Sequence, residues 1–251
     1  MKITRGITLV ALAAAALLGA AADASSQAAP RGAAAGASTQ SAGFRFEAQD
    51  TAGTRWFKGN THTHTLESDG DSPPEDVAAW YRDNGYNFLV LSDHNVHNDG
   101  GGDALGMEAV WDYLLTRGKR IYGIAVDDAH HFKVVGRDHA NPGRGWVTVR
   151  ARSLVPLSIV AALEAGAFYA STGVELDDIV VTDRRLEVHI RPIGSFRHTT
   201  RFIGAGGRVL LETGANPAVF ELQGPEVCVR AVVHDSGGWR AWVQPVFVAG
   251  G

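Results

Sequence analysis

Two patterns of apolar and polar positions divide the chain near residue 177. Before that point, short continuous apolar runs alternate with stretches whose apolar residues recur at helical spacing. A short continuous run is typical of a parallel strand buried on both faces. We expect a first short strand at 56–61, and the apolar runs predict strands at 88–91, 121–126 and 168–170, with helices at 73–84, 106–117 and 156–165 between the strands. This alternation predicts a parallel α/β core with right-handed crossovers.

The first of these helices has signals at both ends. Ser72-Pro73-Pro74-Glu75 has the form of a capping box, with Ser72 as the N-cap, Pro73 in the first helical position and Glu75 in the third. Gly85 is expected to end this helix, and Gly118 the next one. The local sequence therefore sets the expected helix boundaries independently of the apolar pattern.

The second pattern begins after Asp177. Short runs of alternating apolar and polar residues occur at 186–190, 209–211, 227–233 and 242–248, with Gly, Pro and Asn between them. Such runs are typical of antiparallel strands. We therefore predict an α/β domain at 44–176 and a small antiparallel β-sandwich at 177–251. Cys228, the only cysteine, lies in one of these runs and is interpreted as a small core residue.

The N-terminus resembles an export signal. Lys2 and Arg5 precede an apolar run from Ile7 to Leu18, and Ala22-Asp23-Ala24 offers a small-x-small cleavage site. We expect a signal peptide at 1–24 and a periplasmic or secreted protein. The alternative is an uncleaved anchor, but spanning a bilayer takes about 20 apolar residues and this run is shorter. Residues 25–43 are rich in Ala, Gly and Ser and are expected to form a flexible linker.

The composition adds two exclusions. Hydrophobic residues make up 45% of the 251 positions and charged residues 20%, an ordinary globular balance. The formal net charge is −4, which excludes the basic footprint expected of a nucleic-acid-binding protein. Nor can a single cysteine form an internal disulfide.

The residues able to carry chemistry are concentrated in one part of the chain. Seven of the ten histidines lie between residues 62 and 139. Three groups follow three of the predicted strands: His62, His64 and Asp69; Asp93 and His94; Asp128 and His130. The C-terminal ends of parallel strands meet at one edge of a sheet, where α/β proteins place their active sites. Imidazole and carboxylate together suit Zn²⁺, Mn²⁺ or Fe²⁺.

Each group also has a simpler interpretation. An isolated His-x-His is more often a pair of exposed polar residues, and an Asp-His pair after a strand is often a turn with a helix cap. Asp128 could likewise be an N-cap. Three such groups at the same edge of one predicted sheet favour a metal site over three unrelated caps.

The same groups carry a family resemblance. The segment His62-Thr63-His64-Thr65-Leu66-Glu67-Ser68-Asp69-Gly70 resembles the opening motif of PHP (polymerase and histidinol phosphatase) domains. Ser92-Asp93-His94-Asn95 resembles their second motif, and Val126-Asp127-Asp128-Ala129-His130 their closing Asp-x-His motif. The likeness is greatest to the secreted, carbaryl-hydrolase-like subgroup and spans Trp56 to about Val248.

The resemblance implies a distorted seven-stranded β/α barrel that holds two or three divalent metals. It implies a metal-ligand set of His62, His64, Asp69, His94, Asp128 and His130. Asp93 and Asp128 are the candidate catalytic residues, with Asp93 expected to orient His94 or a neighbouring ligand. The implied activity is that of a metal-dependent phosphoesterase using a metal-activated hydroxide.

The chain departs from the family pattern between the second and closing motifs. The glutamate and histidines of the family's middle strands have no counterpart, and only His97, Asp99, Asp103, Glu108, His131 and His139 lie nearby. The expected fold is therefore a truncated PHP-type β/α barrel, with parallel strands and outer helices, followed by the sandwich. An incomplete site would hold at most one metal tightly.

Three functions stay open on this evidence. The first is hydrolysis of a small phosphoester, with Lys133 or Arg152 as candidate contacts to an anionic substrate. The second is hydrolysis of a carboxyl or carbamate ester at the same site. The third is a catalytically impaired remnant that serves as a metal-binding or interaction module. A truncated barrel would also expose strand edges, and homo-oligomer formation through those edges is one alternative for covering them.

Overall fold

A computed structural model describes residues 44–47, 50–93 and 107–249. Within them, twelve strands and three short α-helices are formed. The strands are β1 (Arg45–Phe46), β2 (Arg55–Asn60), β3 (Phe88–Leu89), β4 (Trp146–Ala151), β5 (Phe168–Ser171), β6 (Leu176–Val181), β7 (Arg185–Ile190), β8 (His198–Ile203), β9 (Val209–Thr213), β10 (Ala218–Glu221), β11 (Cys228–Asp235) and β12 (Arg240–Ala249). The helices are α1 (Pro74–Asp83), α2 (Met107–Thr116) and α3 (Pro156–Glu164), with a 3-10 turn at Ala205–Gly207.

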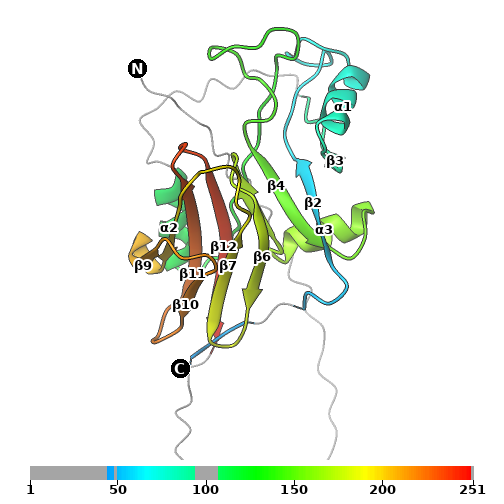
Figure 1. The fold of residues 1–251 in the computed structure, drawn as a ribbon. Coiled ribbons are helices and arrows are strands. Elements are labelled where there is room, and N and C mark those ends of the chain that lie inside the picture. The colour runs from blue at the N-terminus through cyan, green and yellow to red at the C-terminus, as the bar shows by residue number, and fades with distance from the viewer. Residues whose placement is uncertain (1–43, 48–49, 94–106, 250–251) are drawn as a thin grey trace, which may run out of the picture.

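The described strands form two sheets. The larger has nine strands in the order β3-β2-β4-β5-β12-β11-β8-β9, with β1 paired to β12. The smaller has three strands in the order β10-β7-β6. Within the large sheet β2 and β3 are parallel, whereas β2 with β4, β4 with β5 and β5 with β12 are antiparallel. The large sheet is therefore mixed and mostly antiparallel (Figure 1).

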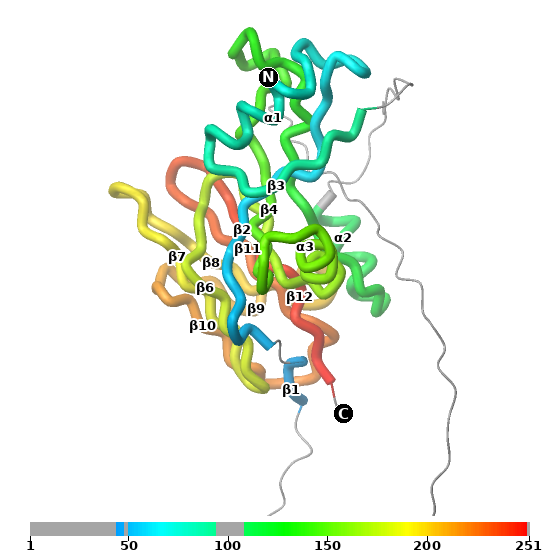
Figure 2. Tube along the Cα trace, turned by 90° about the vertical axis from the view of Figure 1, so that its right-hand side faces the viewer, coloured from blue at the N-terminus to red at the C-terminus, as the bar shows by residue number. Residues whose placement is uncertain are grey.

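The molecule is layered, with the large sheet in the middle (Figure 2). One of its faces packs on the small sheet, and α2 and α3 cover the other. Residues of β11 alternate accordingly: Val229 and Val233 enter the core between the sheets, while Cys228 and Val232 face α2. Burial on both faces is what a strand needs to carry a continuous apolar run. The interpretation of Cys228 as a small core residue is confirmed by its burial.

The expectation of a truncated β/α barrel is wrong. Among the described residues, parallel pairing is confined to β2 with β3 and to one isolated bridge between Thr63 and Ala129. The chain leaves β4, forms α3 and returns as β5, yet β4 and β5 run antiparallel, so this is not a βαβ crossover. The continuous apolar runs misled the prediction because a sandwich strand covered by helices is also buried on both faces.

The segment 121–126 shows the error most clearly, because it forms no strand. It packs against Trp111 and Leu115 of α2 and is held by side chains. The amide of Gln244 donates to the Gly123 carbonyl (2.8 Å) and accepts from the Gly123 N–H (2.9 Å). The indole of Trp111 donates to the Ile121 carbonyl (3.0 Å). A glutamine and a tryptophan thus replace the hydrogen bonds that a neighbouring strand would supply.

The expected separate sandwich after residue 177 is also not formed. The strands β8, β9, β11 and β12 continue the sheet that contains β2, β4 and β5, and only β6, β7 and β10 make the second layer. The strand β4 was missed by the sequence analysis, although all six of its residues are buried. The predicted ends of the first two helices are confirmed, since Gly85 and Gly118 both adopt positive φ just beyond a helix.

The capping box of the first helix is wrong by one position. Pro73 is the N-cap and no side chain caps the first turn. The Ser72 hydroxyl donates to the Asp71 carboxylate instead (2.7 Å). No helix in the described part of the chain is long and apolar enough to cross a membrane.

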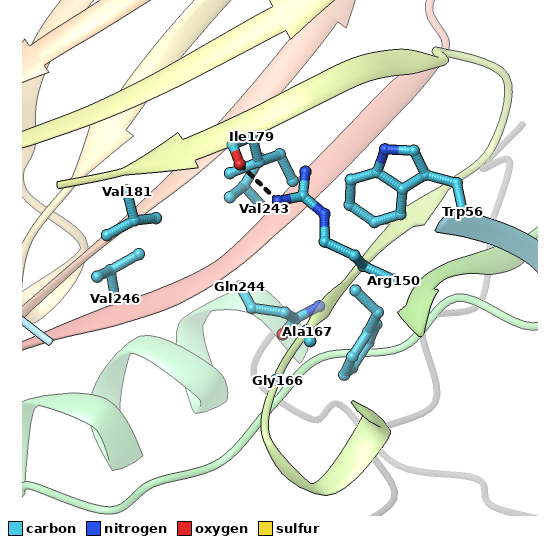
Figure 3. A pocket seen from close by; sticks show the side chains of 10 residues that line it. Trp56, Arg150, Gly166, Ala167, Ile179, Val181, Val243, Gln244 and Val246 are labelled. Carbon is cyan, nitrogen blue, oxygen red and sulfur yellow. Dashed lines mark hydrogen bonds between the residues drawn. The ribbon is translucent and has the colours of Figure 1, made fainter. Parts of the chain in front are cut away.

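A small hollow lies between the two sheets (Figure 3). Arg150 projects into it from β4, stacks on Trp56 with its guanidinium carbon 4.2 Å from the ring centre, and donates to the Ile179 carbonyl (3.0 Å). It also pairs with Asp178. The space has room for about one water molecule, so this buried arginine joins the two sheets and does not mark a substrate site.

Candidate metal centre

Three chain segments meet beyond the C-terminal end of β2. The Thr63–Ala129 bridge joins the segment after β2 to the segment before the 131–145 loop, and the His64 N–H donates to the Ala129 carbonyl (3.0 Å). On the other side, the Ser92 N–H donates to the Thr63 carbonyl (3.0 Å). The described residues of the three sequence motifs therefore lie next to one another at this end, in the loops above β2 and β4 in Figure 1.

Three side chains form a compact group of potential ligands. His62 Nε2 lies 3.1 Å from His64 Nε2, and each of these nitrogens lies 3.1 Å from Asp128 Oδ1. The three atoms make an equilateral triangle. His64 is buried, whereas 31% of the His62 side chain and 57% of the Asp128 side chain are exposed. The triangle is thus fixed from the protein side and open toward solvent.

The spacing of this triangle fits a metal ion. Bonds of about 2.0–2.1 Å to three atoms at this separation correspond to angles of about 95–100° at the metal, between octahedral and tetrahedral values. Two imidazoles and one carboxylate on one face are a common donor set for divalent transition metals. The residues present therefore fit such an ion.

Hydrogen bonds on the far nitrogens orient both rings. His62 Nδ1 lies 3.0 Å from the Ser92 hydroxyl, and His64 Nδ1 lies 3.2 Å from Asp69 Oδ1 and 3.3 Å from the Ser68 hydroxyl. A carboxylate behind the second ring nitrogen is the usual way to fix the tautomer of a metal-ligating histidine. Both rings therefore present Nε2 to the triangle.

A second group shares His64 and consists of His64, Asp69 and His130. His130 stacks on His64, with ring centres 4.0 Å apart, and its Nε2 lies 3.3 Å from Asp69 Oδ1. The other nitrogen of His130 lies 2.7 Å from the Asp128 carbonyl oxygen. This group also has the composition of a metal site, but its contact with His64 runs through Nδ1.

The environment of the triangle favours the protonation states that a metal needs. Burial, reinforced by the neighbouring rings of His130 and His62, lowers the pKa of His64 and favours the neutral imidazole. The hydrogen bond from His62 lowers the pKa of Asp128 to about 2, so this carboxylate stays ionised at neutral pH. A neutral imidazole and an ionised carboxylate are the ligand forms of these side chains.

Two local backbone features hold the ligands in place. Asp128 has a φ of +51°, a left-handed conformation that aspartate tolerates better than most residues. Gly70 allows the turn after His64 to close tightly, because a Cβ there would lie 2.8 Å from the carbonyl carbon and oxygen of His64. The turn that carries Asp69 therefore wraps directly against His64.

Asp93 lies beneath this turn and not at the triangle. Its carboxylate accepts hydrogen bonds from the Thr65 N–H (2.7 Å), the Thr65 hydroxyl (3.0 Å) and the Ser68 hydroxyl (2.7 Å). Burial opposes its ionisation, but these hydrogen bonds outweigh burial and lower the pKa of Asp93. In the structure Asp93 positions the 65–68 turn behind His64.

The remaining candidates are of two kinds: some lie outside the described part of the chain, and others are described. His94, His97, Asp99 and Asp103 lie outside the described residues. Glu108 faces Arg230 and Arg240, and His131 faces His139 with ring centres 4.8 Å apart. Neither joins the triangle.

The two proposed substrate contacts are also engaged elsewhere. Arg152 pairs with Asp50 (2.6 Å), and the Lys133 ammonium donates to the Asp71 carbonyl. Neither cation is therefore placed to meet a substrate at the triangle.

Sequence analysis missed the polar residues that support the ligands. The motif that contains Ser92 predicts no role for its hydroxyl, and the sequence pattern predicts Asn60 only as part of a strand. Asn60 is fully buried at the end of β2, where an uncompensated polar side chain would be costly. A polar residue at the end of a predicted strand, two positions before His62, was the available signal.

We compared the chain with protein-family models, curated sequences and solved structures. No protein-family model, no curated protein sequence and no solved structure matches this chain.

Proposed function

We propose that this chain is a metal-dependent hydrolase of small phosphoesters. The observation that carries the proposal is the triangle of His62 Nε2, His64 Nε2 and Asp128 Oδ1, with all three separations at 3.1 Å. The resemblance of the three motifs to PHP domains supports the same reaction class. The exposure of His62 and Asp128 leaves the outer side of the triangle accessible to a small molecule.

His62, His64 and Asp128 would hold the ion, which we expect to be Zn²⁺, Mn²⁺ or Fe²⁺. A divalent ion in such a site polarises an ester oxygen and lowers the pKa of a coordinated water. Asp69 holds the proton on His64 Nδ1 and so keeps Nε2 available. His94, which follows Asp93 directly in the sequence, is the candidate for a fourth ligand.

One ion is favoured over two. His62 and Asp128 lie next to Nε2 of His64, whereas Asp69 lies next to Nδ1 of the same ring. A neutral imidazole keeps a proton on one of its two nitrogens, so only the other can bind a metal. The proton on Nδ1 has an acceptor in Asp69, which leaves Nε2 for the metal. We therefore expect one tightly held ion and a turnover below that of a two-metal enzyme, which clamps both the attacking and leaving oxygens.

Two alternatives use the same residues. Hydrolysis of a carboxyl or carbamate ester requires the same ion and the same open face. A metal-binding module without turnover is favoured by one observation: among the described residues, no glutamate lies with the histidines and aspartates that could hold a metal.

Parallel assays distinguish these three functions. The full chain would be tested on an aryl phosphate and on the matching aryl ester, with added Mn²⁺ or Zn²⁺. We expect turnover of the phosphate, loss of turnover in His64→Gln, and unchanged turnover in His189→Gln, which removes a histidine of β7 outside the proposed site. Turnover of the ester alone would replace the first function by the second. Metal binding without either activity would leave the third.

Export is a separate proposal, supported by Lys2, Arg5 and the apolar run at 7–18. Mass spectrometry of the native protein should show a mature N-terminus near Ser25. An intact N-terminus in the cytoplasm would contradict it.

A further inference from the structure

Asn60 and Asp127 link the two loops that supply the triangle. Asn60, fully buried at the end of β2, accepts a hydrogen bond at Oδ1 from the His62 N–H (2.8 Å). Its amide Nδ2 donates to Asp127 Oδ2 (2.6 Å). One side chain thus fixes the backbone of His62 and the residue next to Asp128.

Asp127 is a buried carboxylate whose two oxygens are fully used. Oδ1 accepts the backbone N–H groups of Arg144 (2.5 Å) and Gly145 (2.8 Å). Oδ2 accepts the Asn60 amide and the hydroxyl of Tyr81 (2.8 Å). Only 7% of Asp127 is exposed, so it does not itself face the open side of the triangle. Its hydrogen bonds hold the 127–128 segment against β2, α1 and the start of β4.

The backbone before Asp127 lies close to the backbone at Gly145. A Cβ on Gly145 would lie 2.7 Å from the Val126 carbonyl oxygen and 3.1 Å from its nitrogen. The segment before Asp127 is therefore packed directly on the segment before β4. A loss of hydrogen bonds to Asp127 would loosen the peptide that leads to Asp128 and the contact with Asn60, which holds the His62 backbone.

We propose that Asn60 and Asp127 are positioning residues that set the separation between the His62 and Asp128 ligand atoms. The inference rests on the proposed metal site and adds the device that keeps its ligands at binding distance. Neither residue touches the ion. Their effect passes through the His62 backbone and through the peptide between Asp127 and Asp128.

The chemistry of the pair makes the inference testable, because each member has a fixed role. Asn60 must accept on one side and donate on the other, which an amide can do and a carboxylate cannot. In Asp127→Asn, the NH₂ group of the new asparagine would face another donor, either the Asn60 amide or the backbone N–H groups of Arg144 and Gly145. In Asn60→Asp two carboxylates would face each other. Either single change breaks the link, but the double change restores an amide–carboxylate pair with the donor on the other side.

The experiment is a double-mutant cycle on the full chain with Co²⁺ as the probe. Calorimetry gives the Co²⁺ affinity and the visible spectrum reports the ligand geometry, neither of which requires activity. We expect Asn60→Asp and Asp127→Asn to bind Co²⁺ about 10–100-fold more weakly than wild type, the usual effect of losing a group that supports a ligand. The double variant should bind close to wild type and recover its spectrum.

A second pair of variants tests the inference even if the variants of the cycle fold poorly. Tyr81→Phe removes only the hydroxyl that donates to Asp127, and we expect a smaller loss of affinity with a changed spectrum. Tyr169→Phe is its matched control, since Tyr169 is equally buried and its hydroxyl accepts the Leu176 N–H (3.2 Å) in the sandwich core. It should lower the melting temperature without changing Co²⁺ binding.

The outcomes separate the inference from the proposed function. A wild-type chain that binds no Co²⁺ would overturn the metal site and the inference with it. Wild-type binding that is unchanged in Tyr81→Phe and in every folded variant of the cycle would overturn the inference alone. Weakened single variants without recovery in the double variant would also overturn it, because the pair would then have no specific link.

Discussion

The core between the two sheets and the loop end that carries the histidines are held together by different interactions. In the core, apolar side chains such as Leu186, Val188 and Phe202 are fully buried on strands whose polar groups are satisfied by ladder hydrogen bonds. At the loop end, side chains such as Asn60 and Asp127 hold the backbone directly. Apolar burial tolerates small shifts, whereas each hydrogen bond of a buried polar network requires one geometry. The core therefore supplies stability, and the loop end supplies the exact spacing that a metal needs.

The largest effect should come from the core. Leu186 on β7 is fully buried, and Leu186→Ala should lower the free energy of unfolding by about 2–5 kcal/mol through lost burial and the cavity it leaves. Denaturant unfolding measures the loss. Leu211→Ala on the edge strand β9 is the matched control, because 37% of Leu211 is exposed, and it should cost much less.

The same variant tests the separation of the two regions. Folded Leu186→Ala should bind Co²⁺ as the wild type does. A loss of metal affinity in proportion to the loss of stability would show that the core and the loop end are one cooperative network, and the comparison would fail.

An intermediate effect is expected at the turn behind His64. Gly70→Ala places a Cβ 2.8 Å from the His64 backbone, and relief of that overlap should cost about 1–3 kcal/mol of stability. The shift falls on His64 itself, so metal affinity should drop as well. Gly224→Ala is the control, because its Cβ would meet no atom within 4 Å and should change neither quantity. Equal behaviour of the two variants in thermal unfolding and calorimetry would contradict the tight turn.

The smallest effect concerns pH. Burial lowers the pKa of His64 at the loop end and of His234 on β11. The unfolded chain then binds protons that the folded chain does not, so the metal-free protein should lose stability as pH falls below about 6.5. The free energy of unfolding should change with pH by less than the one-proton limit, which is about 1.4 kcal/mol per pH unit for each histidine. His64→Gln and His234→Gln should each remove part of the slope measured by denaturant unfolding between pH 7 and pH 5. An unchanged slope in His64→Gln would show that this ring is not held neutral by burial.

The same contrast explains how far the sequence could predict the fold. Four strands after residue 177 and the helix ends at Gly85 and Gly118 follow local rules of alternation and helix termination, and these predictions are confirmed by β7, β9, β11, β12 and the two helices, whereas β8 and β10 were not predicted. The partner of each strand depends on contacts far along the chain, so an apolar run cannot tell a parallel strand from a helix-covered sandwich strand. The segment 121–126 shows the limit, because the glutamine that satisfies its backbone lies at position 244.

The candidate site could be predicted better than the fold around it. The spacing within each motif located five side chains that the structure brings together: His62, His64, Asp69, Asp128 and His130. Their proximity needs only the parallel contacts of β2 with β3 and of Thr63 with Ala129, not a whole barrel. The supporting role of Ser92 could not be predicted, because a single polar residue carries no spacing pattern, and for Asn60 the only signal was its place at the end of a predicted strand, two positions before His62.

The most direct test of the account is the metal content of the purified full chain, loaded with Zn²⁺ and dialysed against metal-free buffer. We predict one Zn²⁺ ion per chain, none in His62→Gln, and one in His189→Gln, whose histidine lies on β7. The same retained amount in wild type and His62→Gln, whether one ion or none, would contradict the claim that His62, His64 and Asp128 form a metal site.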